Sequence, residues 1–188
     1  MQMIKKWGSC AVSFLAGFLA LVLGLILPGM VTSMSMMGVS ETEKTKAMDI
    51  LTDKDLLDGA KMYDLESEFS SMKTFSLILT IVAVLLIIYA VVVVLKKLDV
   101  IKFENKLFDY AGFALLALFL IAAIGVLITS LNYAGEVTDA VSVAVEAMGG
   151  EASVKIGAYQ PVMLVVSLLA AGGFGYLEYE TLKGLLKK

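Results

Sequence analysis

The chain has 188 residues, of which 59% are hydrophobic, and its formal net charge is −3 at pH 7. Its mean hydropathy of +0.88 and its apolar content lie above those of soluble domains, in which about 45–50% of residues are apolar. The composition therefore excludes an ordinary soluble domain. All fifteen basic residues are Lys and no residue is His, so the commonest general base and metal ligand is missing.

Four stretches of the chain contain no Asp, Glu or Lys, namely residues 7–40, 74–95, 110–135 and 156–177. Each exceeds the ~20 apolar residues that a helix needs to cross a hydrocarbon core of ~30 Å. Helices are favoured there because backbone groups in lipid must be satisfied within the segment. We therefore predict an all-α membrane protein, a four-transmembrane-helix bundle with short amphipathic helices in its two extracytoplasmic loops.

One integral membrane domain, residues 1–188, accounts for the whole chain. Its predicted spans are approximately 8–30, 74–95, 109–132 and 161–180, its outer loops are 31–73 and 133–160, and its inner connection is 96–108.

The first predicted span begins near Trp7, which is a suitable interfacial anchor. The uncharged run that follows is longer than the apolar region of a signal peptide, so we expect a retained span. Ala16, Ala20 and Gly24 recur every four residues and predict close packing against another helix. Pro28 is expected to kink this helix or to end it.

Beyond Pro28 the uncharged run continues with several Met residues. If it is helical, Met30, Met34 and Met37 share one face, and Met suits an adaptable contact surface. Two interpretations stay open: the protein's own outer loop covers these residues, or they contact a partner subunit.

The first outer connection, residues 41–72, combines acidic residues with periodic apolar ones and predicts two short amphipathic helices broken near residue 52, with Gly59 as a second candidate break. The last helix is expected to run into the second span. Thr52 followed by Asp55 resembles a capping box. The acidic residues do not fit a calcium loop, because position six counted from Asp53 is Asp58 and not Gly. They predict a solvated acidic face.

The second outer connection contains an apolar stripe that includes Val137, Val141 and Val145, and Gly149-Gly150 follows it. This pattern predicts a further amphipathic helix that ends at the glycines.

The fourth predicted span opens at Pro161, because Pro is favoured in the first turn of a helix. Its second half contains Gly172, Gly173 and Gly175. These predict close helix packing, with a broken helix around a ligand as the alternative.

The distribution of Lys predicts the orientation in the cell membrane. The side that holds both termini carries nine Lys and five acidic residues, a net charge of +4, whereas the other side carries six Lys and thirteen acidic residues, a net charge of −7. The positive-inside rule therefore places both termini in the cytoplasm. At this inner rim Glu178 is expected to pair with Lys96.

No catalytic, cofactor or metal site is predicted from the residues. The span interiors contain no ionisable Asp, Glu or Lys, which argues against a proton relay. Cys10 is the only Cys, so no intramolecular disulfide can form. We expect a protein that is not an enzyme and does not bind nucleic acid.

The plan of four spans with a longer first outer loop is similar to that of claudins and other eukaryotic tetraspan proteins. The likeness is one of topology. Claudins carry a Trp and paired Cys in the first loop and tetraspanins carry Cys pairs in their large loop, whereas this chain has a single Cys and a single Trp, both in the first span.

The sequence contains several stripes of residues suited to helix packing and no recognisable catalytic residues, which favours a non-enzymatic structural or assembly protein. Its partners would be the lipid bilayer and either further copies of itself or other membrane subunits. Two alternatives stay open: an oligomeric pore or channel with an acidic outer mouth, and a small-molecule or lipid carrier that uses the Gly-rich part of the fourth span.

Overall fold

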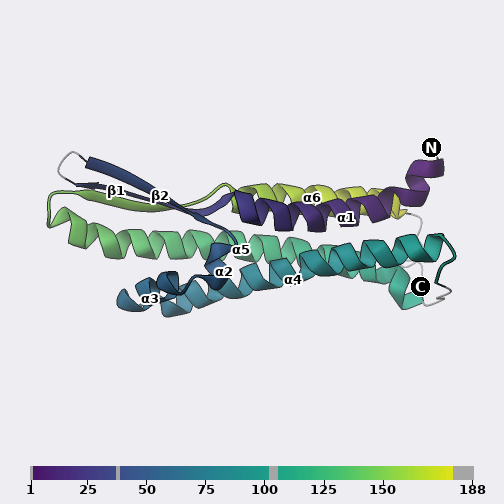
Figure 1. The fold of residues 1–188 in the computed structure, drawn as a ribbon, viewed down its shortest axis with the longest axis horizontal. Coiled ribbons are helices and arrows are strands. Elements are labelled where there is room, and N and C mark those ends of the chain that lie inside the picture. The colour runs from purple at the N-terminus through teal and green to yellow at the C-terminus, as the bar shows by residue number, and fades with distance from the viewer. Residues whose placement is uncertain (1, 37–38, 102–105, 180–188) are drawn as a thin grey trace.

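The computed structural model describes residues 2–36, 39–101 and 106–179. Its four long helices are α1 (Gln2–Ile26), α4 (Glu66–Lys97), α5 (Lys106–Glu146) and α6 (Tyr159–Leu177). Successive long helices run in opposite directions, so the start of α1 and the end of α6 lie at the same end of the molecule (Figure 1). All four are long and apolar enough to cross a membrane, as a multi-pass membrane protein requires.

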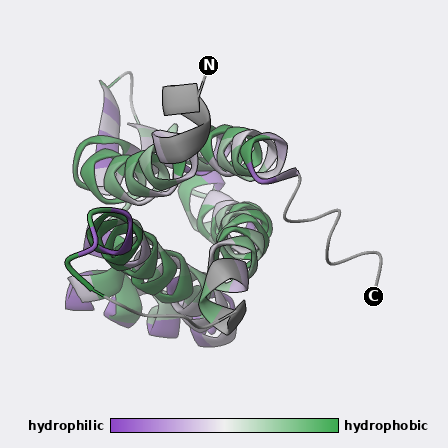
Figure 2. Cartoon of the chain, turned by 90° about the vertical axis from the view of Figure 1, so that its right-hand side faces the viewer, coloured by the Kyte–Doolittle hydropathy of each residue, from purple (hydrophilic) through white to green (hydrophobic). Residues whose placement is uncertain are grey.

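The four long helices form a bundle around one axis (Figure 2). Helix α1 packs against α4 and α6, and α5 packs against the same two helices. Leu86, Phe119, Met163 and Phe174 are fully buried between them. The bundle interior is therefore a packed core.

Large apolar side chains also cover the outside of the bundle. Phe18, Ile81, Ile121 and Leu169, one from each long helix, are between 47% and 71% exposed. In water this exposure would forgo about 25 cal/mol for each Å² of apolar surface left unburied. Lipid tails remove that penalty, so the outward face fits a bilayer better than it fits water.

Two helices are longer than a bilayer core requires. Helix α5 has 41 residues, and at 1.5 Å per residue it is about 60 Å long, roughly twice the hydrocarbon thickness. Helix α4 has 32 residues. Their extra length lies at the end opposite to the start of α1, where the remaining elements gather (Figure 1). We call this part, residues 28–73 and 133–157, the head.

The head contains an antiparallel sheet in the order β2-β1-β3, made of β1 (Pro28–Met36), β2 (Val39–Lys46) and β3 (Glu151–Ile156). The register aligns Thr32 of β1 with Glu43 of β2 and Val154 of β3. This sheet corrects the prediction of an all-α protein.

The prediction that Met30 and Met34 share one face of a helix is also wrong, because both residues belong to strand β1. Helix α1 ends at Ile26, just before Pro28, which cannot continue the hydrogen-bond ladder. A spacing of four residues keeps two side chains on one face in a helix and in a strand alike, so the two Met positions did not discriminate between them. Met37 lies outside the described residues.

The second outer connection also differs from its prediction. No break separates the third span from the amphipathic stripe, because α5 continues without interruption to Glu146. Gly149 then adopts φ +74° and its N–H bonds to the carbonyl of Glu146, as a glycine at a helix end commonly does. Strand β3 follows, and its alternating Ala152, Val154 and Ile156 are the signal that could have identified it.

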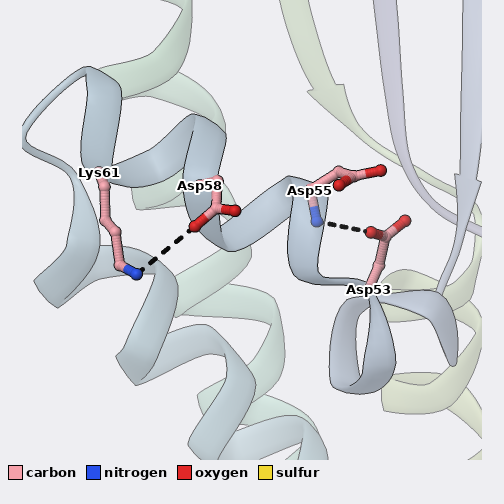
Figure 3. Close-up of polar contacts among 4 residues, drawn as sticks. All are labelled: Asp53, Asp55, Asp58 and Lys61. Atoms are coloured by element: carbon pink, nitrogen blue, oxygen red, sulfur yellow. Dashed lines mark hydrogen bonds and ion pairs between the residues drawn. The ribbon is translucent and has the colours of Figure 1, made fainter.

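The first outer connection holds two short helices, α2 (Asp49–Thr52) and α3 (Lys54–Met62). The N-cap of α3 is Asp53, whose Oδ1 accepts a hydrogen bond from the Asp55 N–H at 2.9 Å (Figure 3). The helix start expected at Thr52 is therefore displaced by one residue, and Asp53 acts as a simple N-cap rather than as part of a capping box. Asp carboxylates cap helix starts as well as Thr hydroxyls do, so both residues were compatible with the pattern.

The head has a hydrophobic core of its own. Ile50, Phe69 and Met72 are almost fully buried there, together with Met30 from β1. The ring of Phe69 lies 5.5 Å from that of Tyr133 on α5, measured between centroids. The extensions of α4 and α5 are therefore held by packing between apolar side chains.

Candidate partner-binding cleft

A cavity in the described part of the head lies between the sheet, α3 and α5 and has a volume of about 230 Å³. Its lining combines apolar side chains with a polar minority. The lining residues are Met30, Thr32, Met34, Thr45, Asp55, Leu56, Gly59, Tyr63, Tyr133, Val137, Thr138, Val141, Ala152, Ser153 and Val154. We call this cavity the outer cleft.

The sheet supplies one wall of the outer cleft because of its register. Met30, Thr32 and Met34 alternate along β1 and therefore lie on one face of the sheet. Met30 is buried, whereas Met34 is 38% exposed. The head therefore covers Met30, as the first interpretation of the Met residues expects. Met34 stays accessible in the cleft, and its contact with a partner stays a prediction.

The opposite wall is the outer part of α5, and a hydrogen-bonded clamp fixes the sheet to it. The hydroxyl of Thr138 accepts a hydrogen bond from the Val154 N–H at 2.8 Å. Its own proton has the Ala134 carbonyl at 2.7 Å and the Val154 carbonyl at 3.1 Å as acceptors. An edge strand normally leaves its outer backbone groups unpaired, so the bond from Val154 holds β3 against the helix.

A polar junction joins the head to the bundle. The Gln160 Nε2 donates to the Gly29 carbonyl at 2.7 Å and to the Ser130 Oγ at 3.2 Å, and the Gly157 N–H donates to the same Gly29 carbonyl at 2.8 Å. A Cβ on Gly157 would collide with the Pro28 carbonyl. This close approach fixes where the sheet leaves the membrane-spanning part.

One carboxylate, that of Asp55, lies in the lining of the outer cleft. On the same helix Asp58 pairs with Lys61 at 3.5 Å (Figure 3), and that exposed pair contributes little stability. The acidic residues of the head outnumber its Lys residues by thirteen to six, so the head as a whole attracts cationic groups.

The stripe of small residues on α1 lies inside the bundle. Ala16 and Ala20 are 2% and 3% exposed, and the Tyr159 hydroxyl donates to the Ala20 carbonyl at 3.4 Å. A Cβ on Gly24 would contact the Tyr159 ring at 3.5 Å. The stripe therefore faces the start of α6.

The glycines of α6 lie differently from those of α1. A Cβ on Gly172 or Gly175 would meet no other described atom within 4 Å, and one on Gly173 would meet Val12 only at 3.8 Å. Among the residues that the structure describes, no helix therefore lies close to the Cβ positions of Gly172 and Gly175. Their role in packing stays a prediction.

Two close helix–helix contacts occur at isolated glycines that belong to no glycine-rich run in the sequence. A Cβ on Gly17 would collide with the Ala83 carbonyl, and one on Gly125 would collide with the Phe75 ring. A single glycine within an apolar span gives no sign of which neighbour it will face. The sequence therefore offered no signal for these two positions.

At the opposite end of the bundle Lys96 lies 5.8 Å from the ring centroid of Phe108. The ion pair between Glu178 and Lys96 stays a prediction. Among the described residues no three His, Cys, Asp or Glu side chains gather closely enough to hold a metal ion. The outer cleft therefore offers apolar surface, hydroxyl groups and negative charge, which serve binding.

A comparison of the chain with family models, with curated proteins and with solved structures finds no match.

Proposed function

We propose that this protein is a non-enzymatic assembly subunit of a membrane complex and that its outer cleft binds a segment of a partner protein. The observation that carries the proposal is the cleft itself, which leaves Met34 accessible above the buried Met30. Met adapts to partner surfaces of different shape. The fold holds this cleft rigidly on two helices and a clamped strand.

The partner segment should carry an apolar side chain with basic residues beside it. The apolar lining, which includes Leu56, Val137 and Val141, would receive the former. Asp55 and the net negative charge of the head would attract the latter and would raise the rate of association. The partner is either another copy of this chain or a different membrane subunit.

The orientation follows from the charge difference between the two ends. With both termini in the cytoplasm of a cell, as the positive-inside rule predicts, the head and its cleft lie outside the cell membrane. The cleft would then receive an extracytoplasmic segment of the partner.

The two other functions have less support. A pore through one chain conflicts with the packed interior at Phe119 and Phe174, so a channel would have to form between several copies. A carrier site at Gly172 and Gly175 lacks an enclosing wall among the described residues. Conductance across a bilayer that contains the reconstituted protein would support the channel alternative.

The test is the native mass of the protein extracted from its own membrane in mild detergent, with every co-purifying chain identified. Met34→Lys should weaken the association by about tenfold or more, because an unpaired ammonium is costly in an apolar contact. Val143→Lys is the matched control, since Val143 is an exposed apolar residue of the head that lies outside the cleft lining.

The wild-type mass should exceed that of the 20.1 kDa chain, and the control variant should retain the larger mass. Copies of this chain alone would make the complex a homo-oligomer, and a fixed second protein would make it heteromeric. If Met34→Lys kept the wild-type mass and the same co-purifying chains, the cleft would not be the assembly surface.

A further inference from the structure

A second cavity lies far from the head, on the outside of the bundle between α1 and α4. It is an open groove with a volume of about 420 Å³. Ala11 of α1 and Ala90 of α4 are the small residues of its lining, and Trp7, Phe14 and Leu95 are the large ones. Small side chains between large ones leave a hollow that is open to the lipid side, since Ala11 and Phe14 are exposed.

The groove lies at the end of the bundle where α4 finishes at Lys97. The Lys97 Nζ lies 3.6 Å from the Cys10 Sγ and 5.9 Å from the centroid of the Trp7 ring. Both Cys10 and Trp7 line the groove, so the ammonium is held at its mouth. A Lys at the end of a span places its charge at the membrane surface while its methylene stem stays in apolar surroundings.

The groove is therefore amphipathic along its length, with apolar walls and a positive charge at one end. Its walls are apolar along the depth of the membrane, and a cation stands where the lipid headgroups begin. Trp is enriched at this same interfacial level. Basic groups beside a crevice between spans are typical of sites for anionic lipid headgroups.

We infer that this groove binds one anionic phospholipid, with an acyl chain against Ala11 and Ala90 and the headgroup phosphate beside Lys97. The site is independent of the outer cleft, because the two share no lining residue and no residue of α1 or α4 lines the outer cleft. Its occupant comes from the leaflet that contacts the termini of the chain.

Trp7 makes the inference directly measurable, because it is the only Trp of the chain and it lines the groove. The full-length protein is reconstituted into vesicles of equal parts phosphatidylcholine and phosphatidylglycerol. Bromine, which quenches Trp fluorescence on contact, is placed on the acyl chains of one lipid or of the other. The surface charge is then identical in both preparations, and only the labelled species differs.

Brominated phosphatidylglycerol should quench Trp7 as expected for an association preference of about fivefold, the attraction of roughly one Lys for anionic lipid. Added salt should reduce this preference, since screening weakens charge attraction at a surface. Equal quenching by the two brominated lipids in the wild-type protein would overturn the inference without any substitution.

Three variants locate the site. Lys97→Gln should abolish the preference and Lys97→Arg should retain it, whereas Ala11→Phe should fill the groove and lower quenching by both lipids. Ala117→Phe is the matched control, because Ala117 is an exposed Ala on α5 outside the groove. A full preference in Lys97→Gln would show that lipid gathers around Trp7 without this site.

Discussion

The bundle and the head of this protein differ in the side chains that they expose. In the bundle large apolar residues such as Phe119 are buried together with Ser13 and Ser167, while other large apolar residues such as Ile121 face outward. In the head Ile50 and Phe69 are buried and the charged residues face outward. One chain therefore follows two packing rules, because lipid is as apolar as a Leu side chain and water is not.

The energetic origin of stability differs accordingly. Burial of apolar surface from water stabilises the head. The bundle gains little from such burial and depends on close contact between helices, which small residues permit. Substitutions of one type should therefore differ in the size of their effect between the two regions.

The largest expected effect is the loss of a head core residue. Phe69→Ala should lower the free energy of unfolding by about 4 kcal/mol, the usual cost of deleting a fully buried Phe side chain. Leu118→Ala, which removes a 49% exposed residue of the bundle, should have an effect below about 1 kcal/mol, since lipid replaces the lost contacts. Equilibrium denaturation in detergent micelles measures both, and equal losses would break the comparison.

Charge placed on an exposed apolar position should give the next largest effect. Ile121→Lys should cost about 3 kcal/mol, because Lys at the centre of a membrane helix is strongly disfavoured. Val143→Lys, at a more exposed position of the head, should cost almost nothing. Membrane insertion measured after expression should fall only for Ile121→Lys; normal insertion of that variant would place α5 outside the lipid.

The smallest of the three effects concerns two glycines of the bundle. Gly17→Leu should destabilise the protein by about 2 kcal/mol, since added atoms collide with the Ala83 backbone. Gly172→Leu should change stability by less than about 0.5 kcal/mol, since the space there is open. Thermal unfolding of the isolated protein distinguishes the stabilities of the two variants. A complex that loses its partner with Gly172→Leu, but keeps its monomer stability, would assign this glycine to an intermolecular contact.

The sequence predicted the four long apolar helices well because each long uncharged run has few alternatives in lipid. It indicated the end of α1 through Pro28. The amphipathic helices expected in the two loops are matched only in part, because α2 and α3 form in the first connection whereas the stripe of the second belongs to α5. The sequence did not predict the sheet, because Met30 and Met34 are spaced by four residues and fit either period. Strand β3 was also missed, since six residues between a glycine pair and a span are a weak signal.

The outer cleft could be predicted only in part. Met34 was a candidate contact residue in one of two open interpretations, and its neighbours in the cleft come from distant segments. Tyr133 and Thr138 belong to the third long helix, while Leu56 belongs to a short helix near the start of the chain. No local pattern states that these segments meet.

The sequence by itself determined that this protein has four helices able to cross a membrane, and it set the charge difference between their two ends. Apolar length and the position of Lys decide these properties locally, because each helix satisfies its own backbone. The tertiary structure alone decided that α5 continues into the head, that Thr138 clamps Val154, and that Gly17 rather than Gly172 marks a close crossing. These features depend on contacts between residues far apart in the chain, and such contacts exist only once the helices and strands have packed.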